Sequence, residues 1–147
     1  MSQLTIQDVA RQSGLTEPTL RYYEHVGLLG PIARDPSSGY RRYAEADLDS
    51  AQVLACLRAM GVGIEDMRTY QQNRAVGGPE AAVAQRELLA RHAQRVEEQI
   101  ATLRVHQAYL REKSALWDAR ARGDAEAEAS ARERVLEIIP NLAAVVR

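Results

Sequence analysis

A short run of tyrosines and arginines is the first place where this sequence could do chemistry. The letters GYRRY at residues 39–43 include Tyr40, Arg41 and Arg42. On a short β-ribbon, two exposed guanidinium groups can donate hydrogen bonds to the phosphate backbone of a nucleic acid. A solvated hairpin without a partner would use the same residues, so the surrounding elements must decide between the two interpretations.

The charge composition of the chain limits how it could bind a nucleic acid. The 147 residues include 19 basic and 20 acidic side chains, and Lys113 is the only lysine. Because the formal net charge is −1, an anionic ligand must be bound by a local patch rather than by the chain as a whole. Arginine suits bidentate contacts with phosphates or bases. Biased genome composition would produce the same excess of arginine.

Cysteine and histidine usage predicts a protein without a metal ion or cofactor. The single cysteine, Cys56, excludes an intrachain disulfide and a cysteine-rich metal cage. His92 and His106 lie about 21 Å apart on one predicted helix, so they cannot share an ion within one chain. The first residues have neither the basic nor the apolar part of a signal peptide, and no apolar run approaches about 18 residues. We therefore expect a cytoplasmic protein that does not enter a membrane.

Two short helices are predicted before the arginine-containing segment. Thr5 and Thr16 can each cap a helix N-terminus, while Gly14 and Gly27 end the two helices. A gap of only a few residues, centred on Gly14, gives the helix-turn-helix pattern. Helical hairpins are common, so this pattern becomes specific only together with the ribbon that follows it.

Two more helices complete the predicted N-terminal part. The first runs over about residues 45–60 and the second over about 64–74. In the first of these helices, Cys56 and Met60 fall on the apolar face at helical spacing, so both are expected to point inward. The linker AVGG at residues 75–78 closes the compact part of the chain.

A long helix is predicted over residues 79–121. Its apolar residues repeat every seven positions, which indicates a coiled coil. Packing against its own domain is the alternative, but a helix of roughly 60 Å is too long for that. Since the chain has no second helix of equal length, we expect a homodimer. The residues predicted to join its two copies are Leu89, Val96, Ile100, Leu103, Leu110 and Trp117.

Six stretches in the first half of the chain follow one another in unbroken order. They are TIQDVA at 5–10, GLT at 14–16, TLRYYE at 19–24, GLL at 27–29, GYRRY at 39–43 and LRAMG at 57–61. This ordered set resembles the MerR family of transcriptional regulators over about residues 3–72. Two departures concern helix caps, because Ala44 and Gly63 stand where the family usually has capping side chains.

The resemblance implies a mainly α fold. A winged helix-turn-helix DNA-binding domain would occupy residues 3–74. A long dimerisation helix would follow at 79–121 and form an antiparallel coiled coil. The remaining residues, 122–147, would form a short helical tail that packs on the dimer.

The resemblance also implies a mode of DNA recognition. The second helix would enter the major groove of double-stranded promoter DNA, where Arg21 would read a base. The other residues expected near bases or phosphates are Thr16, Thr19, Tyr22, Tyr40, Arg41 and Arg42. Family members are dimers that bend and untwist a promoter so that RNA polymerase can engage it. That distortion costs several kcal/mol, which contacts at both ends of the site must offset.

The signal that such a regulator senses is left open by the sequence. The place of Cys56 resembles that of the lone cysteine in the aldehyde- and electrophile-responsive branch of the family (the NmlR/AdhR type). A thiolate there could be alkylated or oxidised and so shift its helix. In the opposing interpretation, Cys56 is an inert, buried hydrophobic residue.

Other functions remain open beside that one. A small apolar effector could bind between the coiled coil and the tail, around Trp117, Ile138 and Leu142. The chain could instead be a coiled-coil adaptor that has lost DNA binding. A thiol enzyme is disfavoured, because no histidine or aspartate near Cys56 in the sequence suggests an activating base. No enzymatic activity is predicted.

Overall fold

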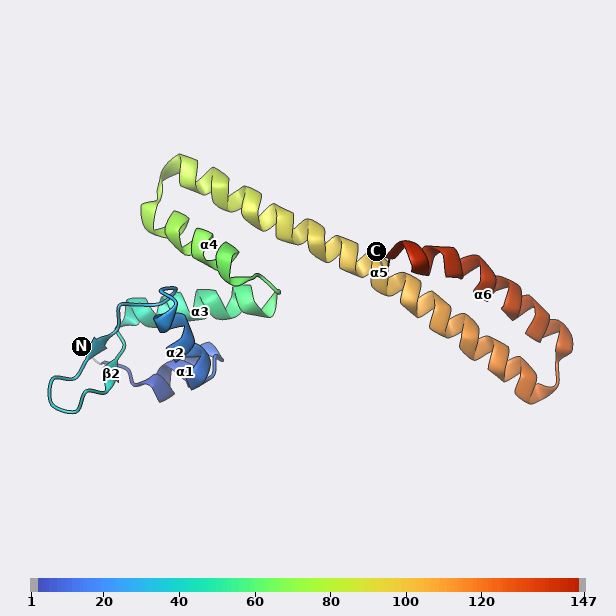
Figure 1. The fold of residues 1–147 in the computed structure, drawn as a ribbon, viewed down its shortest axis with the longest axis horizontal. Coiled ribbons are helices and arrows are strands. Elements are labelled where there is room, and N and C mark those ends of the chain that lie inside the picture. The colour runs from blue at the N-terminus through green and yellow to red at the C-terminus, as the bar shows by residue number, and fades with distance from the viewer. Residues whose placement is uncertain (1–2, 146–147) are drawn as a thin grey trace. The chain divides into compact units, whose positions relative to one another are not determined.

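The computed structural model describes residues 3–145 and is mainly helical, as predicted (Figure 1). Two short strands form the small antiparallel ribbon, and six helices account for most of the described chain. The helices are α1 (Ile6–Ser13), α2 (Glu17–His25), α3 (Glu45–Ala59), α4 (Ile64–Val76), α5 (Gly78–Arg122) and α6 (Ala125–Val145), and the strands are β1 (Ala33–Arg34) and β2 (Arg41–Arg42).

The chain divides into two compact units, residues 1–89 and residues 90–147. Helix α5 begins in the first unit and ends in the second. The division expected from the sequence, at residues 3–74, 79–121 and 122–147, stays a prediction.

The first two helices begin and end where their local sequence dictates. Thr5 and Asp8 form a reciprocal capping box at α1, with the Thr5 N–H donating to Asp8 Oδ2 at 2.9 Å and the Asp8 N–H donating to Thr5 Oγ1 at 3.1 Å. Gly14 ends α1 with a φ of +83°, a left-handed conformation that glycine adopts without a steric penalty. The predicted helix-turn-helix is therefore confirmed.

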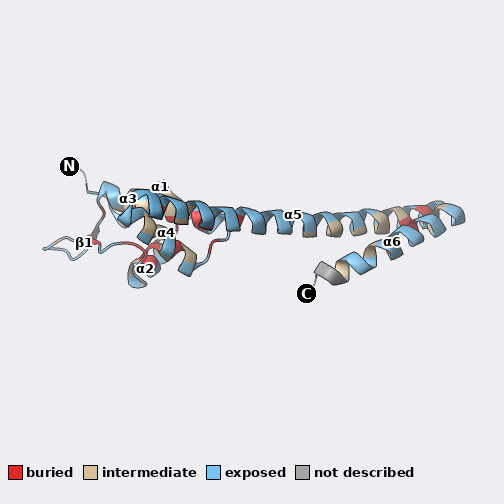
Figure 2. Ribbon diagram, turned by 90° about the horizontal axis from the view of Figure 1, so that it is seen from above, coloured by how far each residue is buried: buried red, intermediate tan, exposed pale blue. Residues whose placement is uncertain are grey.

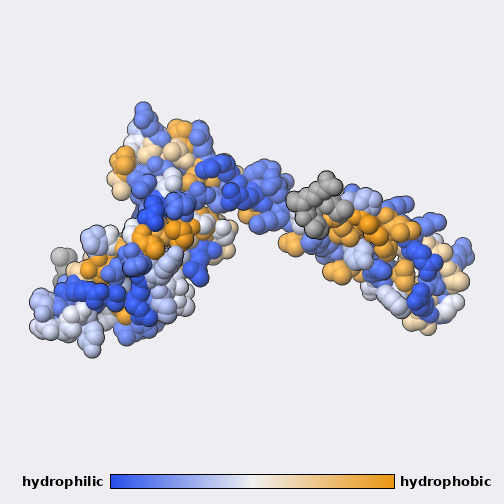
Figure 3. Space-filling view, viewed as in Figure 1, coloured by the Kyte–Doolittle hydropathy of each residue, from blue (hydrophilic) through white to orange (hydrophobic). Residues whose placement is uncertain are grey.

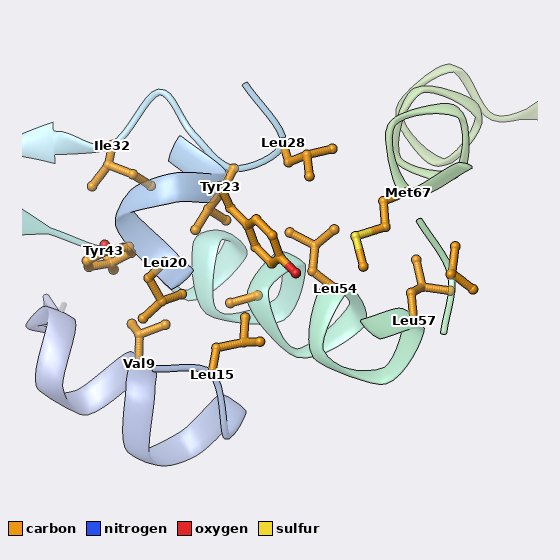
Figure 4. Packing of buried hydrophobic residues seen from close by; sticks show 13 residues of the cluster. Val9, Leu15, Leu20, Tyr23, Leu28, Ile32, Tyr43, Leu54, Leu57 and Met67 are labelled. Atoms are coloured by element: carbon orange, nitrogen blue, oxygen red, sulfur yellow. The ribbon is translucent and has the colours of Figure 1, made fainter. Parts of the chain in front are cut away.

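One hydrophobic core holds the first unit together (Figure 4). Every helix from α1 to α4 contributes to it, for example through Val9, Leu20, Leu54 and Met67. Tyr43, which follows β2, is fully buried in the same core. Its backbone exchanges two hydrogen bonds with Leu4, of 2.9 and 2.8 Å, so the ribbon is tied to the segment before α1.

The inward orientation expected of Cys56 and Met60 is wrong. The side chains of α3 that are buried are Ala51, Leu54 and Leu57, whereas Cys56 and Met60 are exposed. Each residue of an α-helix turns by about 100°, so Cys56 lies roughly 160° around α3 from Leu54. Apolar character alone did not reveal which side of α3 faces the core.

In the second unit, α6 folds back antiparallel along the C-terminal part of α5 (Figures 1 and 2). Two ion pairs set its position, one from Arg120 Nε to Glu128 Oε1 at 2.6 Å and one from Arg134 Nε to Glu112 Oε2 at 2.7 Å. Between the helices lie the buried side chains Leu116, Ala119, Ala131 and Val135.

The structure does not bring together the three residues expected to surround an apolar effector. The two ion pairs between α5 and α6 place the later residues of α6 beside earlier turns of α5, so Ile138 and Leu142 lie away from Trp117. Trp117 is 57% exposed, and its ring stacks under the Arg120 guanidinium at 4.6 Å. The neighbouring Leu116, not Trp117, faces α6.

Candidate nucleic-acid interface

Helix α2 begins with a cap that also uses two residues expected near DNA. Thr16 Oγ1 accepts a hydrogen bond from the Thr19 N–H at 3.2 Å, and the two hydroxyl oxygens lie 2.9 Å apart. Glu17 and Pro18 occupy the first turn, where a missing N–H leaves no helical hydrogen bond unmade. Thr16 and Thr19 therefore fix the start of α2, and their contact with DNA stays a prediction.

The outer face of α2 carries the expected base-reading residue. Leu20 and Tyr23 are buried, so the intervening Arg21 and Tyr22 point away from the core. Among residues 3–145, Arg21 makes no hydrogen bond or ion pair with another side chain. An arginine has five N–H donors in a fixed planar arrangement, so all of them are available to a ligand. Half of the Tyr22 side chain is exposed.

The ribbon has both of the strands that a wing requires. Arg34 of β1 pairs with Arg41 of β2, and Ala33 pairs with Arg42. The Asp35 carboxylate closes the turn by accepting hydrogen bonds of 2.8 Å from the N–H groups of Ser37 and Ser38. Near the tip of the ribbon, Tyr40 is 77% exposed. Sequence reasoning found β2 but not its partner strand.

The arginines of the ribbon already have partners within the first unit. Arg41 Nε donates to Glu24 Oε1 of α2 at 2.6 Å, and Arg34 Nη2 lies 4.0 Å from the other oxygen of the same carboxylate. Arg42 forms an ion pair with Asp35 and also donates to Gln3 Oε1. Arg41 and Glu24 thus hold the ribbon against α2, while phosphate contacts by Arg41 and Arg42 stay predictions.

One surface hollow joins α2 to the ribbon. Arg21 lines it together with Arg34, Tyr40 and Arg41. Glu24 faces two of these three arginines, so the hollow still gathers more positive than negative charge in a chain whose net charge is −1. Arg34 is the member that sequence reasoning missed. The sequence could have indicated Arg34, because a ribbon that contains Arg41 needs an opposing strand and Arg34 precedes the intervening turn.

Two ionisable groups near this surface have shifted pKa values. The pKa of Asp8 lies below its ordinary value of 3.8, first because the Thr5 backbone N–H donates to its carboxylate. The pKa of Tyr43 lies above its ordinary value of 10.0, chiefly because burial disfavours the charged phenolate. The Tyr43 hydroxyl is buried and has no hydrogen-bond partner among the described residues. Asp8 stabilises the start of α1 and Tyr43 lies in the core, so neither residue lines the hollow.

Comparison with known proteins identifies the family. Residues 4–74 match the MerR HTH family of regulatory proteins. The HTH-type transcriptional regulator AdhR of Bacillus subtilis is 39% identical over 95 residues, which are 65% of this chain and 66% of AdhR. An HTH-type transcriptional regulator of Pseudomonas aeruginosa is 33% identical over 107 residues, 69% of this chain and 77% of that protein. The chain belongs to the MerR family.

A solved structure supports the same assignment for this MerR-family chain. The crystal structure of HiNmlR, a MerR family regulator lacking the sensor domain, bound to promoter DNA, is similar with a TM-score of 0.67. The two sequences are 28% identical, and the similarity covers 86% of this chain and 96% of HiNmlR. The chain is therefore a DNA-binding transcriptional regulator of the MerR type, and the residues that match the family model lie within its first unit.

The described residues contain neither a membrane-spanning helix nor a cluster of metal-binding side chains. No helix within residues 3–145 has the length and apolar character needed to cross a bilayer. Within the same residues, no three side chains of the metal-binding types His, Cys, Asp and Glu come close enough together to hold an ion. Cys56 thus lies on α3 without a surrounding cluster of such ligands.

Proposed function

We propose that this MerR-family protein is a homodimeric regulator that binds one promoter with two copies of its first unit and distorts that DNA in response to a signal. The observation that carries the proposal is the position of Arg21. This side chain is exposed on α2, it is unpaired among the described residues, and it lines one hollow with the ribbon. HiNmlR, a similar regulator, is bound to promoter DNA in its crystal structure.

Each part of the hollow would make a different kind of contact. Arg21 can donate two parallel hydrogen bonds to O6 and N7 of a guanine, which distinguishes that base pair from the others. The exposed Tyr22 and Tyr40 hydroxyls can donate to phosphate oxygens, which orients the protein without reading sequence. Because Arg41 and Glu24 fix the ribbon on α2, base and phosphate contacts would form in one defined register.

The second copy would bind through α5. The six apolar side chains predicted to join two copies are all exposed in the single chain, and such a row is typical of a coiled-coil seam. A symmetric pair would present two DNA-binding units to a site with two-fold symmetry. Distortion of that site would let RNA polymerase engage the promoter, with the deformation energy offset by contacts at both ends.

Substitution of Arg21 tests the proposal. Arg21→Ala should weaken binding to the protein's own promoter fragment by roughly 1–3 kcal/mol and relax base preference at one position of each half-site. The matched control is Arg11→Ala, which removes an exposed arginine of α1 that is paired with Asp8. Fluorescence anisotropy at several salt concentrations would measure both. Unchanged affinity of Arg21→Ala would show that α2 does not read the DNA.

For the signal, we propose an electrophile such as an aldehyde that reacts at Cys56. The exposed thiol supports this, because a reagent can reach it in the single chain without opening the core. Electrophile treatment should add one adduct to the intact mass, and Cys56→Ser should abolish both the adduct and the electrophile-dependent change in promoter transcription. An unmodified Cys56 peptide after treatment would contradict the thiol mechanism.

A further inference from the structure

Two arginines of the ribbon differ in how their ion pairs are built into the fold. Arg41 pairs with Glu24 of α2, so this contact joins two elements, and the Arg41 side chain is only 24% exposed. Arg42 pairs with Asp35, which directly follows β1, and the Arg42 side chain is 44% exposed. The first ion pair holds the ribbon on α2, whereas the second joins two residues of one short hairpin.

The two carboxylate oxygens of Asp35 have different partners. Oδ1 accepts hydrogen bonds of 2.8 Å from the N–H groups of Ser37 and Ser38, and these bonds close the turn of the ribbon. Oδ2 pairs with Nη2 of Arg42. The neutral amide oxygen of an asparagine could accept the same two hydrogen bonds from the backbone. The turn therefore needs the Oδ1 acceptor of Asp35 but not its negative charge.

The Asp35 carboxylate lies among residues that are expected to face DNA. One surface hollow of the ribbon is lined by Asp35 together with Tyr40, Arg41 and Arg42. Strongly hydrophilic side chains reach the surface over the ribbon in Figure 3. Carboxylate and phosphate oxygens accept hydrogen bonds from the same planar donors of a guanidinium group. Asp35 therefore occupies the position on Arg42 that a phosphate of the DNA backbone would take.

A second partner of Arg42 leaves room for an exchange at the first. Nη1 of Arg42 donates a hydrogen bond to Oε1 of Gln3. Gln3 is neutral, so it orients the guanidinium without compensating its charge. Because Gln3 and Asp35 use different nitrogens of Arg42, Nη2 can change its partner while Nη1 keeps its own.

We propose that Asp35 is an internal competitor for the DNA backbone. Its carboxylate pairs with Arg42 in the free chain, and Arg42 exchanges this carboxylate for a phosphate when DNA binds. Arg41 keeps its pair with Glu24 throughout, so the ribbon stays on α2 while Arg42 changes its partner. This inference deepens the proposed DNA binding and rests on it.

Such an exchange lowers the affinity for every DNA sequence. Arg42 first loses its ion pair with Asp35, and the released carboxylate then lies close to the phosphate and repels it. Phosphate contacts carry no sequence information, so the loss of affinity is the same for the promoter and for an unrelated duplex. Asp35 thus restrains the overall affinity for DNA, while the base preference is left to Arg21.

The variant Asp35→Asn in the full chain tests the competitor. It keeps the acceptor that closes the turn and removes the charge, so its melting temperature should stay close to that of the wild type. At low ionic strength it should bind both the protein's own promoter fragment and an unrelated duplex roughly fivefold more tightly. Fluorescence anisotropy at several salt concentrations would measure this, and the salt dependence should become steeper.

The matched control removes the same charge from another ion pair of the first unit. Asp49 pairs with Arg74, and both line a different hollow from that of the ribbon. Asp49→Asn should therefore leave the affinity for both duplexes unchanged. A control variant that binds DNA as tightly as Asp35→Asn would show that the net charge of the chain, and not its position on the ribbon, sets the affinity, and would overturn the competitor.

A double-mutant cycle tests whether Asp35 acts through Arg42. Arg42→Gln alone should weaken binding to both duplexes, because it removes a phosphate contact. In the Arg42→Gln background, Asp35→Asn should tighten binding less than it does in the wild type, since no ion pair remains to be broken. Equal tightening in the two backgrounds would show simple repulsion without an exchange of partners, and would overturn the proposal.

The outcomes separate the competitor from DNA binding itself. If the wild type binds its promoter fragment and Asp35→Asn binds no more tightly, the competitor is overturned and the proposed DNA binding stands. A wild-type chain that does not bind its promoter fragment would overturn the DNA binding proposed above and the competitor with it.

Discussion

The two units of this chain bury hydrophobic residues in very different ways. In the first unit, side chains from four helices and the ribbon converge on one core, and Leu54 is fully buried. In the second, two helices share a narrow seam that includes two alanines, Ala119 and Ala131, while Leu103 remains largely exposed. The first unit thus buries its core within one chain, whereas Leu103 and other large apolar side chains of the second unit are exposed to water in the single chain.

The largest effect expected from this difference is a loss of stability in the first unit. Leu54→Ala should lower the free energy of unfolding by about 2–5 kcal/mol, because it removes a fully buried side chain and leaves a cavity. Leu103→Ala, which deletes the same atoms from an exposed position, should leave that transition unchanged and instead weaken self-association. Thermal unfolding and sedimentation equilibrium of the two variants would measure this. Equal loss of stability in the two variants would contradict the proposed difference between the two units.

A smaller loss of stability is expected when the cap at the start of α2 is removed. Thr16→Ala removes the side chain that caps this helix and should lower the stability of the first unit by about 1 kcal/mol. Because the cap lies within one chain, the loss should be the same at low and high protein concentration. Thr69→Ala, on an exposed face of α4, is the control and should cost little. A concentration-dependent loss for Thr16→Ala would show that the units are coupled.

The smallest effect concerns pH. The folded-state pKa of Asp8 lies below its ordinary value, so its stabilisation of the first unit is present above about pH 4 and is lost as the pH falls through that lowered pKa. Asp8→Asn should therefore reduce the difference in melting temperature between mildly acidic and strongly acidic buffer. Differential scanning calorimetry of the two proteins would detect this, and identical pH profiles would contradict the role of the capping box.

Much of the first unit could be read from local sequence. Thr5, Gly14 and Thr16 act through hydrogen bonds and backbone conformations that involve only their neighbours, so the helix boundaries followed from residue types. The heptad spacing likewise predicted a long α5 with an apolar row, because that pattern depends only on the pitch of the helix.

Apart from the missed strand that contains Arg34, the failures involved contacts between distant segments. Cys56 was expected to face inward because several apolar residues share its spacing, yet the core selects Leu54 and Leu57 instead. Trp117 was grouped with residues of the tail, but the ion pairs that position α6 turn Leu116 inward. The pairing of Arg41 with Glu24 joins residues 17 positions apart, and nothing in the local pattern predicted it.

By itself, the sequence determined where the helices of this protein begin and end and which residue types each one carries, because caps, turns and helical periodicity act over a few residues. Only the tertiary structure decided which face of α3 is buried, which arginines of the ribbon are already paired, and which side of α5 is exposed in the single chain. Those outcomes depend on the packing of segments far apart in the chain, where one choice of buried face sets the exposure of every other residue on the helix.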